Sequence, residues 1–151
     1  MDVISDPNAA RKEWLGLLAR SAAADVARLW HALGMDAPHT ELRAPEIGGV
    51  MVRGRAGAVG AAFNLGEMTV TRASVKLADG TVGHGYVQGR SRDHAVQAAL
   101  VDALMQTQAA PRIEGGMLAP LRNTMGTSRQ DRASKAAATK VDFFTMVRGE
   151  D

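Results

Sequence analysis

The strongest constraint on the fold is an alternating pattern over residues 69–77, followed by Asp79-Gly80 and a second alternating pattern over residues 81–88. Successive side chains of a strand point to opposite faces, so each segment has one apolar and one polar side. Asp-Gly supplies the positive φ angles that a tight turn needs. We therefore predict an antiparallel hairpin with one buried and one wet face. The buried face would carry Thr71, Ala73, Val75 and Leu77, and the wet face Arg72, Ser74 and Lys76.

Helical spacing dominates the first part of the chain. Pro7 suits a first helical turn, and apolar residues at helical spacing predict a helix that ends near Arg20. Ser21 is expected to cap a second helix, which Gly34 would end in the left-handed conformation. The two segments together predict a helical hairpin.

Between the second helix and the predicted hairpin, glycines and prolines are frequent, which favours strands and turns over a helix. Short apolar runs at residues 50–52 and 61–65, around a flexible turn, predict two more strands. Ser91 should cap a helix that runs to about Gln108 and covers the dry face of the sheet. Prolines and glycines over residues 111–120 predict a loop, and residues 122–140 a last helix.

These elements predict an α+β fold with about four antiparallel strands, the N-terminal helical hairpin, a helix on one sheet face and a C-terminal helix. Residues 1–140 would form a single domain, and residues 141–151 an extended docking tail. Ordering a chain end costs roughly 1–2 kcal/mol per residue, so an apolar end needs a surface to bury it. On this chain or on another protein, that contact would use Val141, Phe143, Phe144, Met146, Val147 and Arg148.

Composition narrows the function classes. The chain has 151 residues, a formal net charge of +2 and no cysteine, so nothing calls for a nucleic-acid partner, and disulfides, thiolate metal sites and iron–sulfur ligation within it are excluded. No run of about 18 apolar residues predicts a membrane span, and the first residues lack the pattern of a signal peptide. We expect a soluble cytoplasmic protein.

Motifs for independent catalysis are missing from the sequence. The four histidines lack the spacing of a zinc-binding helix, and no phosphate-binding loop, nucleophile elbow or acid–base carboxylate pair is present. We therefore assign no catalytic residue, no metal site and no cofactor to this chain.

Arginine is the residue type with usable chemistry, because guanidinium groups bind phosphate and carboxylate oxygens in pairs. Arg53, Arg72 and Arg90 lie on or beside the predicted sheet and are candidate phosphate contacts. They would allow a phosphate- or nucleotide-binding regulatory module. The alternative is a solvated strand face. The last helix is also rich in basic residues, which could match an acidic partner or simply face water.

Four segments carry a resemblance to a known family. They are WLGLLA at residues 14–19, GEMTVTRASVKL at 66–77, ALVDAL at 99–104 and VDFFTMVRG at 141–149. In this order, over nearly the whole chain, they resemble the PhnG family, the G subunit of the bacterial carbon–phosphorus lyase core complex.

The resemblance implies a role in phosphonate catabolism within an obligate hetero-oligomer. Members assemble with the I, H and J subunits and act with an ATPase-like L subunit. A phosphonate attacks the ribose C1 of ATP, adenine leaves, and alpha-D-ribose 1-methylphosphonate 5-triphosphate forms. ATP and phosphonate are substrates of the complex, and the later radical cleavage belongs to the iron–sulfur J subunit. The resemblance assigns no catalytic residue to the G subunit, so an accessory role in a transferase complex is expected.

Overall fold

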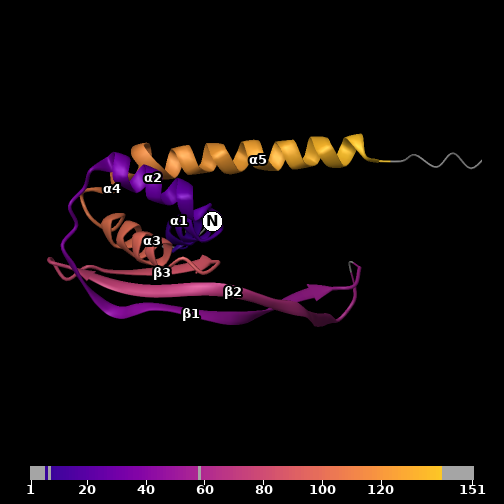
Figure 1. Ribbon diagram of the computed structural model, residues 1–151, viewed down its shortest axis with the longest axis horizontal. Helices are drawn as coiled ribbons and strands as arrows, with labels where there is room; N and C mark the ends of the chain where they lie inside the picture. The colour runs from indigo at the N-terminus through magenta and orange to yellow at the C-terminus, as the bar shows by residue number, and fades with distance from the viewer. Residues whose placement is uncertain (1–5, 7, 58, 141–151) are drawn as a thin grey trace, which may run out of the picture.

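The computed structural model describes residues 6, 8–57 and 59–140, and Figure 1 shows the order of its elements. A three-stranded antiparallel sheet in the order β1-β2-β3 is combined with helices, which confirms a mixed helix and sheet fold. The elements are α1 (Ala9–Arg20), α2 (Ala23–Leu33), β1 (His39–Arg55), β2 (Ala62–Leu77), β3 (Val82–Gln88), α3 (Arg92–Leu104), α4 (Ala110–Ile113), the π-helical segment η1 (Glu114–Leu118) and α5 (Ala119–Ala138).

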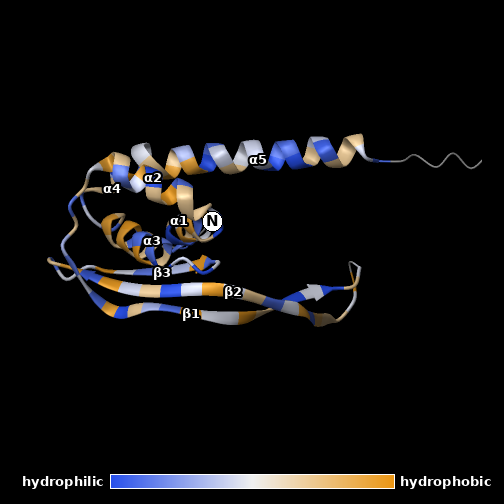
Figure 2. Ribbon diagram, viewed as in Figure 1, coloured by the Kyte–Doolittle hydropathy of each residue, from blue (hydrophilic) through white to orange (hydrophobic). Residues whose placement is uncertain are grey.

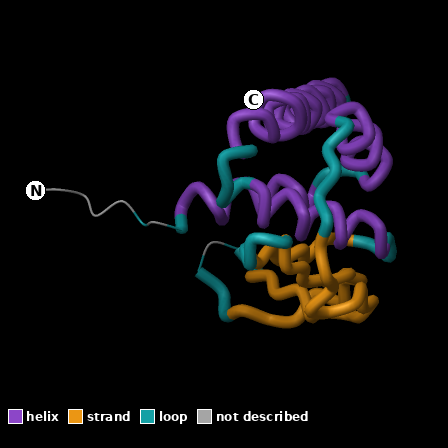
Figure 3. Tube along the Cα trace, turned by 90° about the vertical axis from the view of Figure 1, so that its left-hand side faces the viewer, coloured by secondary structure: helices purple, strands orange, loops and turns teal. Residues whose placement is uncertain are grey.

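The elements form layers. Helices α1 and α3 lie on one face of the sheet, and α2, α4 and the start of α5 lie above them (Figures 1 and 3). Figure 3 shows no described segment over the opposite sheet face. Helix α1 packs on β3 and α3, whereas α2 packs on α3 and η1. The expected helical hairpin is therefore not a unit of its own, since each of its helices has its main contacts elsewhere.

The predicted β2–β3 hairpin is confirmed. Arg72 lies opposite Tyr86 in the ladder, and Gly80 ends the turn at φ 91°. The Asp79 carboxylate accepts a hydrogen bond of 2.9 Å from the backbone N–H of Thr81. Among the described residues only glycines have positive φ, so the turn needs this conformation at Gly80 and not at Asp79. The predicted inner face is buried at Thr71, Ala73, Val75 and Leu77.

The expectation of four strands is wrong. Residues 61–65 and 69–77 belong almost entirely to one long strand, β2, because pairing continues through Gly66 opposite Val52. Strand β1 begins at His39, well before residue 50, and passes through Pro45. Pro45 lies in an irregularity of the pairing between Arg43 and Glu46. An edge strand tolerates proline at such a bulge because no ladder hydrogen bond is lost there.

Most predicted helix ends are confirmed: α1 ends at Arg20 as expected, but α3 stops at Leu104, before the predicted Gln108. Gly34 ends α2 with φ 56°, and the Ser91 hydroxyl accepts a hydrogen bond from His94 N at the start of α3. Ser21 does not cap α2. Its hydroxyl donates to the carbonyl of Leu17 at 2.7 Å, so it closes the end of α1 instead.

The predicted loop at residues 111–120 is wrong, because this stretch is helical. Pro111 lies in the first turn of α4, where a helix needs no N–H donor, and Pro120 lies where the π-helical η1 passes into α5. Gly116 lies in η1, where an added Cβ would overlap the side chain of Leu33. Glycine here permits close packing and does not mark a turn. Helix α5 accordingly begins at Ala119, earlier than the predicted residue 122.

Helix α3 approaches β3 very closely. A Cβ added to Gly83 or Gly85 would overlap the carbonyl oxygens of Ala99 or Ala95, respectively. Small residues on both elements thus bring the helix onto the strand. The buried core continues from this contact through α1, α2, η1 and Leu121 of α5.

A fully buried carboxylate, Asp102 of α3, joins three elements. It accepts two hydrogen bonds from the guanidinium of Arg11 at 3.0 and 2.7 Å and one from the indole of Trp14 at 2.9 Å. A fourth comes from the backbone N–H of His84 at 2.8 Å. Asp102 therefore links α1 and β3 to α3, and its hydrogen bonds raise the pKa of Arg11.

We expect Asp102→Ala to lower the free energy of unfolding by about 3 kcal/mol, because it leaves Arg11, Trp14 and the His84 N–H without their acceptor. Urea unfolding of the purified chain measures this. Exposed Asp131→Ala is the matched control and should change stability by less than about 0.5 kcal/mol. Equal midpoints for the two variants would contradict the role given to Asp102.

Gly85→Ala should also destabilise the fold, by about 1–3 kcal/mol, because the new methyl group forces α3 away from β3. Gly48→Ala in β1 is the control, since its Cβ would meet open space. Thermal unfolding compares the two. Identical melting temperatures would show that α3 does not need this close approach.

Candidate functional site

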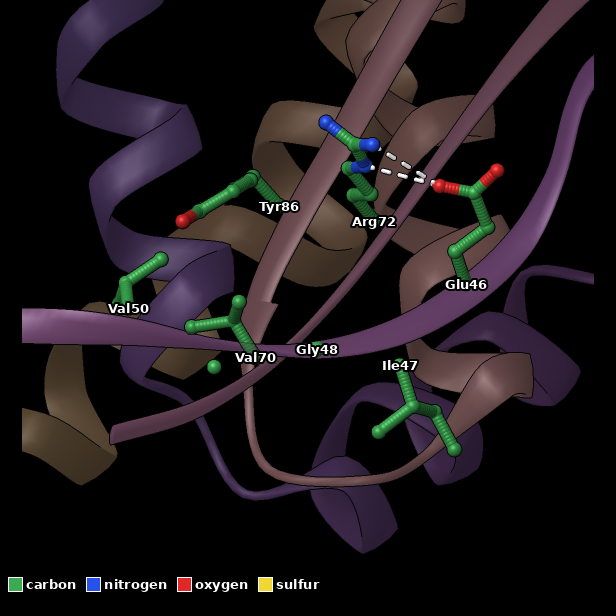
Figure 4. Close-up of a pocket in the computed structure, with 8 residues that line it drawn as sticks. Glu46, Ile47, Gly48, Val50, Val70, Arg72 and Tyr86 are labelled. Carbon is green, nitrogen blue, oxygen red and sulfur yellow. Dashed lines mark hydrogen bonds and ion pairs between the residues drawn. The ribbon is translucent and has the colours of Figure 1, made fainter. Parts of the chain in front are cut away.

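The uncovered sheet face contains a hollow of about 260 Å³ around Arg72. Figure 4 shows Tyr86, Val50 and Val70 on the same side of the sheet as Arg72 and Glu46. Their elements explain this, because Arg72 lies opposite both Glu46 of β1 and Tyr86 of β3 in the ladder. The lining residues are Glu46, Ile47, Gly48, Gly49, Val50, Val70, Arg72 and Tyr86.

The charged side chains at this hollow are largely paired with one another. Arg72 forms an ion pair of 3.0 Å with Glu46, and Arg43 contacts the same carboxylate at 3.2 Å. The hydrogen bond from Arg72 lowers the pKa of Glu46, and the charges of Arg43 and Arg72 act in the same direction. Two guanidinium groups and one carboxylate leave a net charge of about +1. An anion that uses the full fork of Arg72 would have to compete with Glu46.

The three predicted phosphate contacts do not form one site. Arg53 lies seven positions along β1 from Glu46, the partner of Arg72. At about 3.3 Å per residue this places Arg53 roughly 23 Å from Glu46 and roughly 10 Å beyond Val50, the last residue of β1 that lines the hollow. Arg90 is exposed beyond the end of β3 and does not line the hollow. Of the three, Arg72 alone lies in it.

The predicted partner contacts Val141, Phe143, Phe144, Met146, Val147 and Arg148 lie outside the described residues. The tail hypothesis therefore stays a prediction.

A different candidate contact surface lies on β1 and β2. Strand β3 pairs with β2 only from Val70 to Lys76, so the two longer strands continue as a two-stranded hairpin arm, residues 49–69. The arm extends beyond α1 and α3 (Figure 1). Large apolar side chains are exposed on it, with Met51 at 59%, Phe63 at 46% and Leu65 at 62%. Sequence reasoning recognised the short apolar runs but not that they leave the core.

Helix α5 also leaves the core. Leu121 is its one buried residue, and residues 126–138 are exposed along their whole length. The helix projects to the same side of the molecule as the hairpin arm (Figure 1), and hydrophilic colours mark its middle turns in Figure 2. Two long elements thus extend from the body without a core of their own.

Within the described residues, no group of three histidine or acidic side chains is placed to hold a metal ion. A serine–histidine contact exists on the open face, where Ser74 Oγ lies 2.9 Å from His84 Nδ1. Nucleophilic catalysis also needs a group that orients the histidine ring, and no carboxylate in the described part of the chain hydrogen-bonds to it. No described helix is long and apolar enough to cross a membrane.

Comparison with known proteins agrees with the resemblance seen in the sequence. The family model for the phosphonate metabolism protein PhnG matches residues 9–149. A curated relative from Rhizobium meliloti (strain 1021), alpha-D-ribose 1-methylphosphonate 5-triphosphate synthase subunit PhnG, is 42% identical over 143 residues. The match covers 95% of this chain and 92% of the relative. The chain therefore belongs to the PhnG family.

Proposed function

We propose that this chain is an accessory subunit of an alpha-D-ribose 1-methylphosphonate 5-triphosphate synthase in phosphonate catabolism. The complex is proposed from the PhnG family and from the name of the 42% identical relative. The observation that carries the subunit role is that two elements, the hairpin arm and α5, project from the core. Neither element adds much to the stability of the isolated chain, whereas a partner could bury both.

The hairpin arm supports this proposal through its exposed apolar side chains. A two-stranded hairpin is marginally stable in water unless it packs on something. Met51, Phe63 and Leu65 are exposed instead of packing on the helices. Clustered exposed apolar residues commonly mark protein–protein contacts. A partner that covers the arm would stabilise it and hide this surface.

Helix α5 supports the proposal in a similar way. Most helical stability in proteins comes from packing of one face, and this helix has residues 126–138 exposed on all faces. Four alanines within residues 133–138 favour the helix by propensity. Arg129, Arg132 and Lys135 give it an excess of positive charge over Asp131. We infer that other subunits complete its environment.

The partners in this proposal are the I, H and J subunits, with an ATPase-like L subunit acting on the same substrates in the cytoplasm. The complex would catalyse attack of a phosphonate oxygen on the ribose C1 of ATP, with adenine as the leaving group. This chain would supply assembly surfaces and no catalytic residue. Among its described residues no nucleophile, base and orienting group occur together, which favours that division of labour.

A second candidate function is an anion-binding regulatory module. It has one specific observation in its favour, the hollow that places Arg72 beside Tyr86 on the open sheet face. The ion pair with Glu46 weighs against it, because that carboxylate occupies the guanidinium.

Co-expression with an I-type subunit should give a stoichiometric complex, and replacement of Met51 and Leu65 by serine should reduce its yield at least tenfold. Both side chains are exposed in the isolated chain, so the loss would come from the interface and not from folding. Affinity co-purification followed by size-exclusion chromatography measures the yield.

Leu42→Ser is the matched control, because Leu42 is 54% exposed on β1 outside the hairpin arm. It should leave the complex intact. A stable, monomeric chain that ignores the I-type subunit would overturn the proposed function. A complex that forms equally well with the doubly substituted arm would overturn only the role of the arm.

The anion-binding alternative predicts opposite effects for the two members of one ion pair. Arg72→Gln should weaken orthophosphate binding at least tenfold, whereas Glu46→Gln should strengthen it several-fold by freeing Arg72. Isothermal titration calorimetry at low salt tests both, with Arg55→Gln as a control for charge. If neither variant differs from the unmodified chain, the Arg72 hollow does not bind phosphate.

A further inference from the structure

A second hollow, of about 490 Å³, lies where the end of α1 meets α5. Three of its lining side chains are arginines, and the first lies more than a hundred residues before the other two in the sequence. Arg20 is the last residue of α1, and Arg129 and Arg132 are one helical turn apart on α5. The remaining lining residues are Gln88 at the end of β3 and Met125 of α5.

These arginines are not neutralised within the described part of the chain. No ion pair there includes Arg20, Arg129 or Arg132. Carboxylates do line the two adjoining hollows, but each has another cation. Asp25 contacts Arg28 at 3.2 Å, and Glu13 contacts Arg122 at 3.0 Å. The three charges therefore face the hollow without a matching negative charge.

Two of the guanidinium groups are held by their own helices. Arg20 Nε donates to the carbonyl of Gly16 at 2.9 Å, and Arg132 Nε donates to the carbonyl of Ser128 at 3.2 Å. These bonds use only the Nε position and leave both terminal nitrogens of each group for another acceptor. Such partial anchoring lowers the entropy cost of binding, because the side chain is already restrained.

We propose that this arginine hollow binds a short chain of linked phosphates, such as the triphosphate group of a nucleotide. Guanidinium forks match pairs of phosphate oxygens, and three of them match an anion with several negative charges. The volume lies in the range of small-molecule sites, about 300–1,000 Å³. Gln88 adds an amide donor at the rim.

An acidic protein surface is the other class of partner that arginines attract. The geometry favours the small anion, because the charges converge on a concave hollow from α1 and α5 instead of spreading along one exposed face. The contrast with the Arg72 hollow is also informative, since Glu46 cancels one charge there. Identifying the phosphate chain with the triphosphate of the synthase's substrate rests on the proposed function, whereas the binding site itself does not.

Titration calorimetry of the purified full chain with inorganic tripolyphosphate tests the proposal. We expect binding that weakens as salt increases, and at least a tenfold loss of affinity in the double variant Arg129→Gln, Arg132→Gln. The matched control is Arg55→Gln, Lys76→Gln, which removes the same charge from exposed positions of the sheet outside this hollow. Its affinity should stay within about twofold of the unmodified chain. Circular dichroism of both double variants checks that they are folded.

Three results would overturn the inference. One is no binding of tripolyphosphate to the unmodified chain. Another is an equal loss in both double variants, which would indicate attraction by overall charge alone. The third is unchanged tripolyphosphate binding with reduced co-purification of the I-type subunit, which would assign Arg129 and Arg132 to an acidic protein partner. Because assembly is measured separately, failure of this inference leaves the proposed function testable on its own.

Discussion

The packing of α1 and α3 on β3 depends on Asp102, the buried side chain that joins these three elements. A buried carboxylate is costly unless charged and polar donors satisfy it, and here Arg11, Trp14 and the N–H of His84 do so together. The N–H of His84 and the carbonyl of Val82, which accepts from Gln106 at 2.9 Å, lie on the free edge of β3. Side chains of α3 and of the segment directly after it therefore close one edge of the sheet and leave β1 as the other.

In this arrangement, the residues that stabilise the core differ from the residues that are exposed for contacts with other proteins. The core lies between the sheet and the helices, and it receives Leu121 and the partly buried Met125 from α5 and little from the hairpin arm. The two projecting elements can therefore change without loss of the core, which is the arrangement expected of contact surfaces. The body fixes where the hairpin arm emerges, because β2 runs without a break from Val70 and Arg72 into the arm.

Local patterns predicted well where one interaction decides the structure. Alternation alone placed Val75 inside and Arg72 outside, and glycine at position 34 was enough to end a helix. Prediction failed where a residue had two possible roles. Pro111 and Gly116 are typical of loops, yet proline also fits a first helical turn and glycine a crowded helix contact. No pattern in the residues indicated that Asp102 is buried, because a buried aspartate is recognised only from the hydrogen-bond donors that the fold places around it.

The candidate sites show the same limit at longer range. Arg72 was expected on the wet face and lies there. Its partner Glu46 is set by the register of β1 against β2, and this register shifts at the irregularity around Pro45. Arg20 and Arg132 were each assigned to a helix, and only the fold brings these two helices to line one hollow. Charge in the sequence thus indicated which side chains could bind an anion. Whether each one is free to do so depends on carboxylates that the fold places beside it, and these differ between the two hollows.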